Sequence, residues 1–348
     1  MKRNLLALAI LGAFAATASA QSSVTLFGVL DLGVTSIKSG SAGTVQGLTP
    51  GAAATSRLGF RGIEDLGGGL KAGFHLETGI SPDVGAVNTT KFFDRRSTVS
   101  LYGSWGELRL GRDYNPSSRN TYLFEPYIGT SIGTILNFTF ALPTAALGSG
   151  VDRTTLLRTD NAIAYFTPSG LGGFYGEAMV GAGEGAANSK YLSWRVGYKT
   201  GPLDVSAAYG KTETGTNDFK QSNIAGQWDF GVAKLQGLYN VHDFGPLKQK
   251  TWSIGTKVPM GGGELLALYV VNDRSGGAVG SGYGEADDSR MLSGGYYYFM
   301  SKRTTLYGIA ARVTNKGAAK LSVAYVTPAA MQGGETSSGI QFGVSHRF

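Results

Sequence analysis

The residues of this sequence that could carry chemistry are above all its arginines. Several stand in short stretches where apolar residues occupy alternate positions: Arg57, Arg61, Arg95, Arg96 and Arg158. A guanidinium group stays charged and presents five N–H donors, so several converging from separate segments would attract anions. The acids that could accept from them or oppose them are Asp113, Glu125 and Asp160.

Other kinds of chemistry find little support in the sequence. The chain has no cysteine, which excludes disulfides, thiol catalysis and cysteine-ligated metals. His75, His242 and His346 lack the spacing of metal ligands, and neither His75 nor His242 stands in a catalytic triad pattern. The net charge of +7 is spread without a polybasic block, so we expect no nucleic-acid partner. We also expect no cofactor.

The first twenty residues have the three parts of a secretory signal peptide. Lys2 and Arg3 precede an apolar run from Leu5 to about Ala16, and small residues lead to Ala20. The run is too short for a comfortable transmembrane helix, which needs roughly 20 apolar residues. We therefore predict cleavage between Ala20 and Gln21, leaving residues 21–348 as one domain.

Alternation with a period of two residues dominates the rest of the chain and predicts strands. In the stretch 95–112, Val99, Leu101, Leu108 and Leu110 form an apolar row opposite a polar one. Seven short turns, rich in glycine, punctuate such stretches: 65–69, 103–106, 168–173, 200–202, 229–231, 259–263 and 300–303. Eight longer connections alternate with them: 37–54, 81–92, 114–157, 184–190, 214–217, 243–249, 273–289 and 314–337.

Seven turns and eight loops join sixteen strands, which predicts an all-β, 16-stranded antiparallel transmembrane β-barrel. A soluble sandwich or propeller would also have short alternating strands, but neither predicts the asymmetry between short and long connections. In a barrel the apolar row faces lipid and the polar row faces a wet lumen, so we expect no central apolar core.

Parity then assigns each arginine to one side of the wall. Leu58 and Phe60 face lipid, so Arg57 and Arg61 face the lumen. By the same argument Val99 and Leu101 turn Arg96 inward, with Arg95 near the start of its strand. Ile163 and Tyr165 likewise turn Arg158 and Asp160 inward. An arginine on the lipid face at mid-depth would cost about 2–4 kcal/mol, which supports the inward assignment.

Several segments, taken together, resemble the general porins of Gram-negative outer membranes, in particular the β-proteobacterial branch: "SSVTLFGVLD", "TSRLGFRGIEDLGGGLKAGFHLE", "RRSTVSLYGSWGELRLGR", "LRTDNAIAYFTP" and "GVSHRF". The resemblance implies a homotrimer in the outer membrane, in contact with lipid and lipopolysaccharide, that passes small ions and hydrophilic solutes. It also implies that the third long loop, residues 114–157, folds into the lumen and constricts it.

The resemblance extends to single residues. Arg57, Arg96 (or Arg95) and Arg158 match the basic cluster that faces the constriction loop in relatives, and Phe348 matches the terminal signal read by the barrel-assembly machinery. Val29 replaces a frequent lysine of the family. The order of Glu125 and Pro126 is reversed from that of the loop tips of enterobacterial relatives.

These observations lead to the hypothesis of a moderately anion-preferring diffusion channel. A substrate-specific channel is the alternative, although only Phe27 and Tyr102 fall on the lumen side, too few for the aromatic slide of sugar channels. A barrel enzyme is the remaining rival, and no catalytic arrangement in the sequence supports it.

Overall fold

The computed structural model describes residues 23–139, 157–183, 190–213, 217–278, 281–323 and 330–348. One antiparallel sheet contains β1 (Ser23–Ser39), β2 (Thr44–Pro50), β3 (Arg57–Gly67), β4 (Leu70–Ser81), β5 (Ala86–Val87), β6 (Arg96–Gly103), β7 (Gly106–Tyr114), β8 (Arg158–Phe166), β9 (Phe174–Gly181), β10 (Tyr191–Thr200), β11 (Leu203–Glu213), β12 (Asp218–Asp229), β13 (Lys234–Phe244), β14 (Leu247–Met260), β15 (Gly263–Ser275), β16 (Ser289–Phe299), β17 (Thr304–Asn315) and β18 (Ser337–Arg347). The helical segments are η1 (Gly40–Ala42), α2 (Pro116–Leu123) and α3 (Leu136–Thr139).

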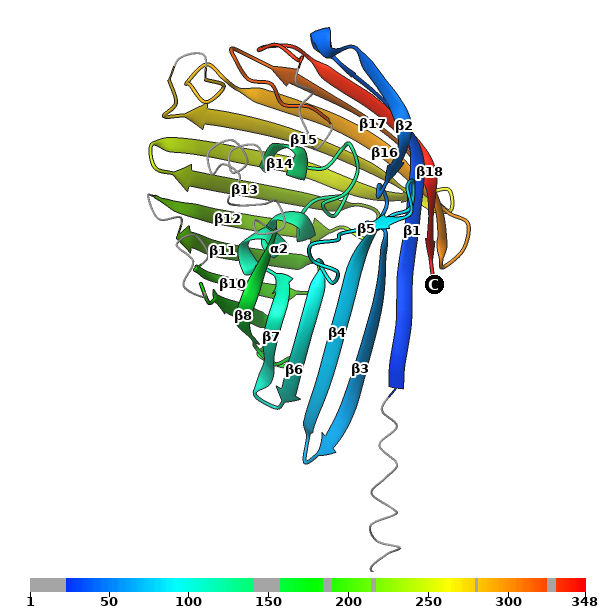
Figure 1. The fold of residues 1–348 in the computed structure, drawn as a ribbon, viewed down its shortest axis with the longest axis vertical. Helices are drawn as coiled ribbons and strands as arrows, with labels where there is room; N and C mark the ends of the chain where they lie inside the picture. Colours follow the sequence, from blue (N-terminus) through cyan, green and yellow to red (C-terminus); the bar gives the residue numbers. More distant parts are fainter. Residues whose placement is uncertain (1–22, 140–156, 184–189, 214–216, 279–280, 324–329) are drawn as a thin grey trace, which may run out of the picture.

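The sheet closes on itself because β1 pairs with β18 on one edge and with β3 on the other. Each remaining long strand pairs with its neighbour in the chain, as Figure 1 shows. The strands β2 and β5 are short additions that pair within the first two long connections. Without them the wall has sixteen strands, which confirms the predicted barrel.

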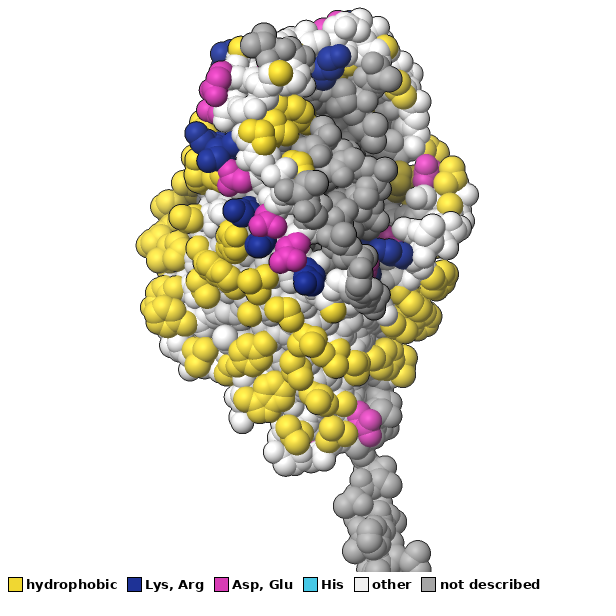
Figure 2. All heavy atoms as spheres, turned by 60° about the vertical axis from the view of Figure 1, so that its left-hand side comes forward, with side chains coloured by type: hydrophobic (Ala, Val, Ile, Leu, Met, Phe, Trp, Pro, Cys, Tyr) yellow, Lys and Arg dark blue, Asp and Glu magenta, His cyan; other side chains and the backbone are white. Residues whose placement is uncertain are grey.

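The outer surface carries the apolar rows that alternation predicts. Val99 is 53% exposed and Leu292 is 64% exposed, whereas Ser100 and Ser293, one position further on, are buried. On the face that Figure 2 shows, apolar side chains form a belt, bordered on one side by a band of Lys, Arg, Asp and Glu. A belt of this kind suits contact with lipid. Because every strand pairs around the closed wall, the backbone N–H and C=O groups are hydrogen-bonded even where the wall lies in hydrocarbon.

Short turns and longer loops alternate along the chain as predicted, with one exception. The seven short turns lie at the predicted positions, and six of them contain glycine or proline. The expected long loop 243–249 is wrong: β13 continues to Phe244 and β14 begins at Leu247, leaving only Gly245 and Pro246 between them. Polar residues there continue the strands beyond the apolar belt. Within the described ranges, no helix combines the length and apolar composition needed to cross a bilayer.

The expectation of an interior without an apolar core is also wrong. Phe124, Tyr127, Ile135 and Phe138, all after β7, form one buried cluster with side chains of β12 to β17. The inward face of those strands offers apolar partners such as Leu266, Leu268 and Met291, not only polar ones. Residues 124–138 therefore pack against one part of the inner wall, and the strands β3 to β8 lie opposite in Figure 1.

Candidate functional site: a cationic patch on the inner wall

Three arginines meet around Glu77 and Tyr114, and we call Arg57, Arg95 and Arg158 the arginine cluster. The Nε atom of Arg95 lies 2.6 Å from Oε1 of Glu77, and a terminal nitrogen of Arg57 lies 3.8 Å from the same oxygen. Glu77 stands in β4 between β3, which supplies Arg57, and the segment that leads into β6. One carboxylate thus holds guanidinium groups from both neighbouring strands.

Arg158 joins this group from β8 by stacking on an aromatic ring. Its guanidinium carbon lies 3.9 Å from the centre of the Tyr114 ring, and its Nε donates to the carbonyl oxygen of Arg95 at 2.8 Å. Tyr114 is the last residue of β7, and its ring also contacts Tyr122 of α2, with ring centres 4.9 Å apart. Because Arg158 is only 5% exposed, its position is fixed by these contacts.

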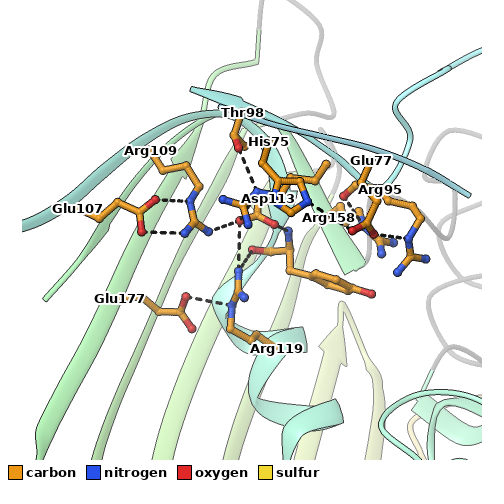
Figure 3. Close-up of polar contacts among 12 residues, drawn as sticks. His75, Glu77, Arg95, Thr98, Glu107, Arg109, Asp113, Arg119, Arg158 and Glu177 are labelled. Carbon is orange, nitrogen blue, oxygen red and sulfur yellow. Dashed lines mark hydrogen bonds and ion pairs between the residues drawn. The ribbon is translucent and has the colours of Figure 1, made fainter. Parts of the chain in front are cut away.

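A second network runs along the same wall from β6 to β10 (Figure 3). Asp113 accepts from Arg109 and lies 3.4 Å from a terminal nitrogen of Arg119 and 3.9 Å from Nε of Arg96. Arg109 also makes two bonds of 2.8 Å to the Glu107 carboxylate. This network therefore includes Arg96 and lies beside the arginine cluster.

Arg119 links the wall to the loop that follows β7. It lies in α2, and its Nε is 3.1 Å from Glu177 of β9, whose other oxygen is 3.6 Å from Arg195 of β10. The two carboxylates it contacts, Glu177 and Asp113, raise the pKa of Arg119 despite its burial. The guanidinium group of Arg119 is thus charged, and the helix is held to two strands by ion pairs.

Asp160 does not lie in either network. It binds Lys91 at 2.6 Å and Arg112 through a hydrogen bond. Parity counted back from Ile163 places Asp160 beside the arginine cluster, but the register between β7 and β8 shifts between Gly111 and Asp113, and Asn161 has a positive φ of 50°. A bulge of this kind breaks the alternation of sides, so parity does not carry through it.

The remaining expected residues are placed as follows. Arg96 lies in the Asp113 network, and Asp113 belongs to β7. Arg61 lies nearer the β3–β4 turn, with its guanidinium carbon 5.1 Å from the centre of the Phe27 ring. Arg57 keeps 29% of its side chain exposed, which makes it the most accessible member of the arginine cluster.

Glu125 differs most from the expectation of an acid facing the pore, because it is fully buried. Its carboxylate accepts from Thr134 Oγ1 and the Gly129 amide, and from the Ile135 amide at 3.3 Å. Burial outweighs these three donors and raises the pKa of Glu125 to about 7. The side chain ties together the turn at 125–135, so its role here is to hold the loop tip.

Sequence reasoning gave no role to several residues that hold the site: Glu77, Tyr114, Arg112, Glu177 and Arg195. Parity could have found Glu177, a lone acid among the alternating apolar residues of β9, and Arg195, which lies directly opposite it in β10. Arg112 could not be found this way, since it lies inside the bulge.

Comparison with known proteins agrees with this architecture. The sequence profile of Gram-negative porins matches residues 7–318. The outer membrane porin protein 32 of Delftia acidovorans is 38% identical over the whole of both chains. The solved structure of the anion-selective porin from Comamonas acidovorans is 35% identical, covers 94% of this chain and 100% of its own, and superposes with a TM-score of 0.82. An outer membrane protein of Vibrio cholerae, 16% identical over 94% of this chain and 98% of its own, shares the fold with a TM-score of 0.64. The closed barrel, the match across most of the chain and the full-length identity place this chain in the family of Gram-negative porins.

Proposed function

We propose that this porin favours small anions over cations, and that the selectivity is set where the arginine cluster faces the segment after β7. As a member of its family the chain is an outer-membrane diffusion channel, not an enzyme. The observation that carries the proposal is the excess of guanidinium groups over carboxylates on one wall: Arg57 and Arg95 share the carboxylate of Glu77, and Arg158 stacks on Tyr114 and bonds the Arg95 carbonyl oxygen. Grouped arginines in a pore attract anions.

The segment after β7 supplies the other side of the proposed neck. Its described part packs against the inward side chains of β12 to β16 through Asn120, which bonds Asn223 at 2.7 Å, and through the Gly133 carbonyl, which accepts from Ser293 at 2.9 Å. We propose that residues 114–157 constrict the lumen; residues 140–156 lie outside the described ranges. The relative named as anion-selective supports the sign of the preference.

The wider assembly is proposed on the family resemblance. We expect a homotrimer that contacts lipopolysaccharide, export with cleavage between Ala20 and Gln21, and insertion by the barrel-assembly machinery through Phe348. The signal peptide lies outside the described residues. The main chain of Phe348 exchanges two hydrogen bonds of 3.1 Å with Gly28, so the last residue completes the pairing that closes the barrel.

Reversal potentials across a planar bilayer in a KCl gradient test the selectivity. The wild type should give a potential of the sign set by chloride. The double variant Arg57→Glu and Arg158→Glu should move it toward the potassium value. The matched variant Lys302→Glu and Lys320→Glu, which changes the same charge at two exposed residues away from the site, should move it much less. A cation preference in the wild type, or equal shifts in both variants, would show the proposal to be wrong.

A further inference from the structure

Two apolar side chains of the segment after β7 are exposed. Leu123, the last residue of α2, is 40% exposed, and Ile128 is 52% exposed. Between them in the sequence, Phe124 and Tyr127 are buried in the apolar cluster that joins this segment to the wall. Because that cluster lies on the inward face of β12 to β17, the exposed side of the same turn faces the lumen.

The backbone at Ile128 is strained. Its φ of 51° lies in the left-handed region, which is a genuine outlier for a β-branched residue. A Cβ atom added at the next residue, Gly129, would lie 3.3 Å from Cβ of Tyr122, so the chain reverses and returns to the end of α2. Leu123 and Ile128 therefore flank one tight turn. A strained residue that is half exposed gains little from packing, and strain of this kind concentrates at ligand-binding sites.

Two aromatic rings connect this turn with the arginine cluster. The ring centre of Tyr122 lies 4.9 Å from that of Tyr114, and the Tyr114 ring carries the guanidinium group of Arg158 at 3.9 Å. Both tyrosines are partly exposed. In the same cluster, Arg57 keeps 29% of its side chain exposed. From the turn to the wall, the lining therefore passes from aliphatic through aromatic to cationic side chains.

We propose that this lining binds small organic anions in which an apolar body adjoins a carboxylate, and that the pore favours them over inorganic or polyhydroxylated anions of equal charge. The carboxylate binds at Arg57, and the apolar body lies against Leu123, Ile128 and the Tyr122 ring. Charge and polarity together decide the occupant. An uncharged apolar solute gains nothing from the arginines, and an inorganic anion gains nothing from the aliphatic side chains. This selectivity rests on the proposed anion preference and names the class of anion that benefits most.

Block of the KCl current through single refolded channels in a planar bilayer tests the site, with hexanoate and gluconate as the added solutes. Both carry one carboxylate on a chain of the same length, but gluconate bears hydroxyl groups where hexanoate is apolar. The wild type should bind hexanoate roughly fivefold to tenfold more tightly, because covering aliphatic side chains removes apolar surface from water. Equal affinities in a channel with an anion-preferring KCl reversal potential would overturn this proposal alone. A cation-preferring KCl potential would overturn the proposed function as well.

Three variants separate the two halves of the site. Ile128→Asn removes the aliphatic side chain, and asparagine accepts a left-handed backbone, so the turn should still form while the affinity for hexanoate falls about threefold or more. Arg57→Gln should weaken hexanoate and gluconate by the same factor, because it removes the charge that both carboxylates meet. Leu171→Asn, at an exposed position of the β8–β9 turn, is the matched control and should bind both solutes as the wild type does. If Ile128→Asn keeps the wild-type ratio of the two affinities, or if Leu171→Asn loses it, the proposal is wrong.

Discussion

The guanidinium group of Arg158 stacks on the ring of Tyr114, with its carbon 3.9 Å from the ring centre. A stacked arginine keeps its charge in one place on the wall, and a desolvated contact of this kind contributes about 2 kcal/mol. We predict that Tyr114→Leu releases Arg158 and lowers the anion preference, while Tyr114→Phe, which keeps the ring, preserves it. Reversal potentials of the two variants, measured side by side, check this; equal values would contradict it.

Glu77 is the carboxylate beside the arginine cluster, and removing its charge should increase the anion preference instead of lowering it. Glu77→Gln removes a negative charge that lies 2.6 Å from Arg95 and 3.8 Å from Arg57, so the anion preference should increase. The variant should also unfold more readily, because Arg95 is buried and loses its charged partner. Glu64→Gln, at an exposed position of β3, is the control. Bilayer potentials and thermal unfolding are the two measurements, and a reduced anion preference would refute the assignment of Glu77.

Alternation assigns side chains to the correct face of the wall only along an unbroken strand. Within an unbroken strand it placed Arg57 opposite Leu58 and Phe60, because the sides of a strand alternate strictly. Alternation does not predict the surroundings of Asp160, because the register between β7 and β8 shifts near Gly111 and Asn161. No residue type in the sequence indicates that bulge. The sixteen strands could be counted from the sequence, because each strand of the barrel repeats the same local pattern: alternating residues followed by a turn or a loop.

Loop residues were predicted less well because their surroundings come from distant segments. The sequence alone predicts that Glu125 is an acid facing the pore. In the structure its carboxylate is buried and accepts hydrogen bonds from Thr134, Gly129 and Ile135. The apolar cluster around Phe138 likewise arises only when the segment after β7 meets β12 to β17. Neither contact has a local signal in the sequence.

Asp31 gives a prediction about how the loop after β1 is held. Its carboxylate is fully buried and accepts from the amides of residues 52–54 at 2.8–3.0 Å and from the Tyr307 hydroxyl at 2.8 Å. Ala52 in turn accepts from Thr130 at 2.7 Å, so Asp31 also supports the segment after β7. We predict that Asp31→Ala costs about 1–3 kcal/mol and raises single-channel conductance as the segment loosens. Asp65→Ala, near the end of β3, is the control. Unchanged conductance with lowered stability would show that Asp31 does not position the loop.

Closure of the barrel at Phe348 predicts that Gly28 cannot carry a side chain. A Cβ atom at Gly28 would lie 2.3 Å from Cζ of Phe348 and 2.8 Å from the backbone oxygen of Arg57. We therefore expect Gly28→Ala to cost about 1–3 kcal/mol, as overpacking does, and to lower the yield of refolded protein. The refolded fraction is measured from the heat-dependent mobility shift in gel electrophoresis. Gly47→Ala, with no atom within 4 Å of the added carbon, should refold normally; equal yields of the two variants would contradict the prediction.

The buried Glu125 predicts that the loop tip depends on pH. Its pKa is raised to about 7, so the folded tip favours the protonated form, whereas the unfolded tip releases the proton near the ordinary value of 4.5. The stabilising contribution of the protonated group is thus complete below about pH 4.5 and is lost as the pH rises toward 7. Hydrogen exchange at the Gly129 and Ile135 amides, corrected for the intrinsic rate, should therefore show less protection at pH 8 than at pH 5. Glu125→Gln cannot ionise, so its protection should not change over that range. If the wild type and this variant have the same pH profile, the carboxyl group of Glu125 does not control the tip.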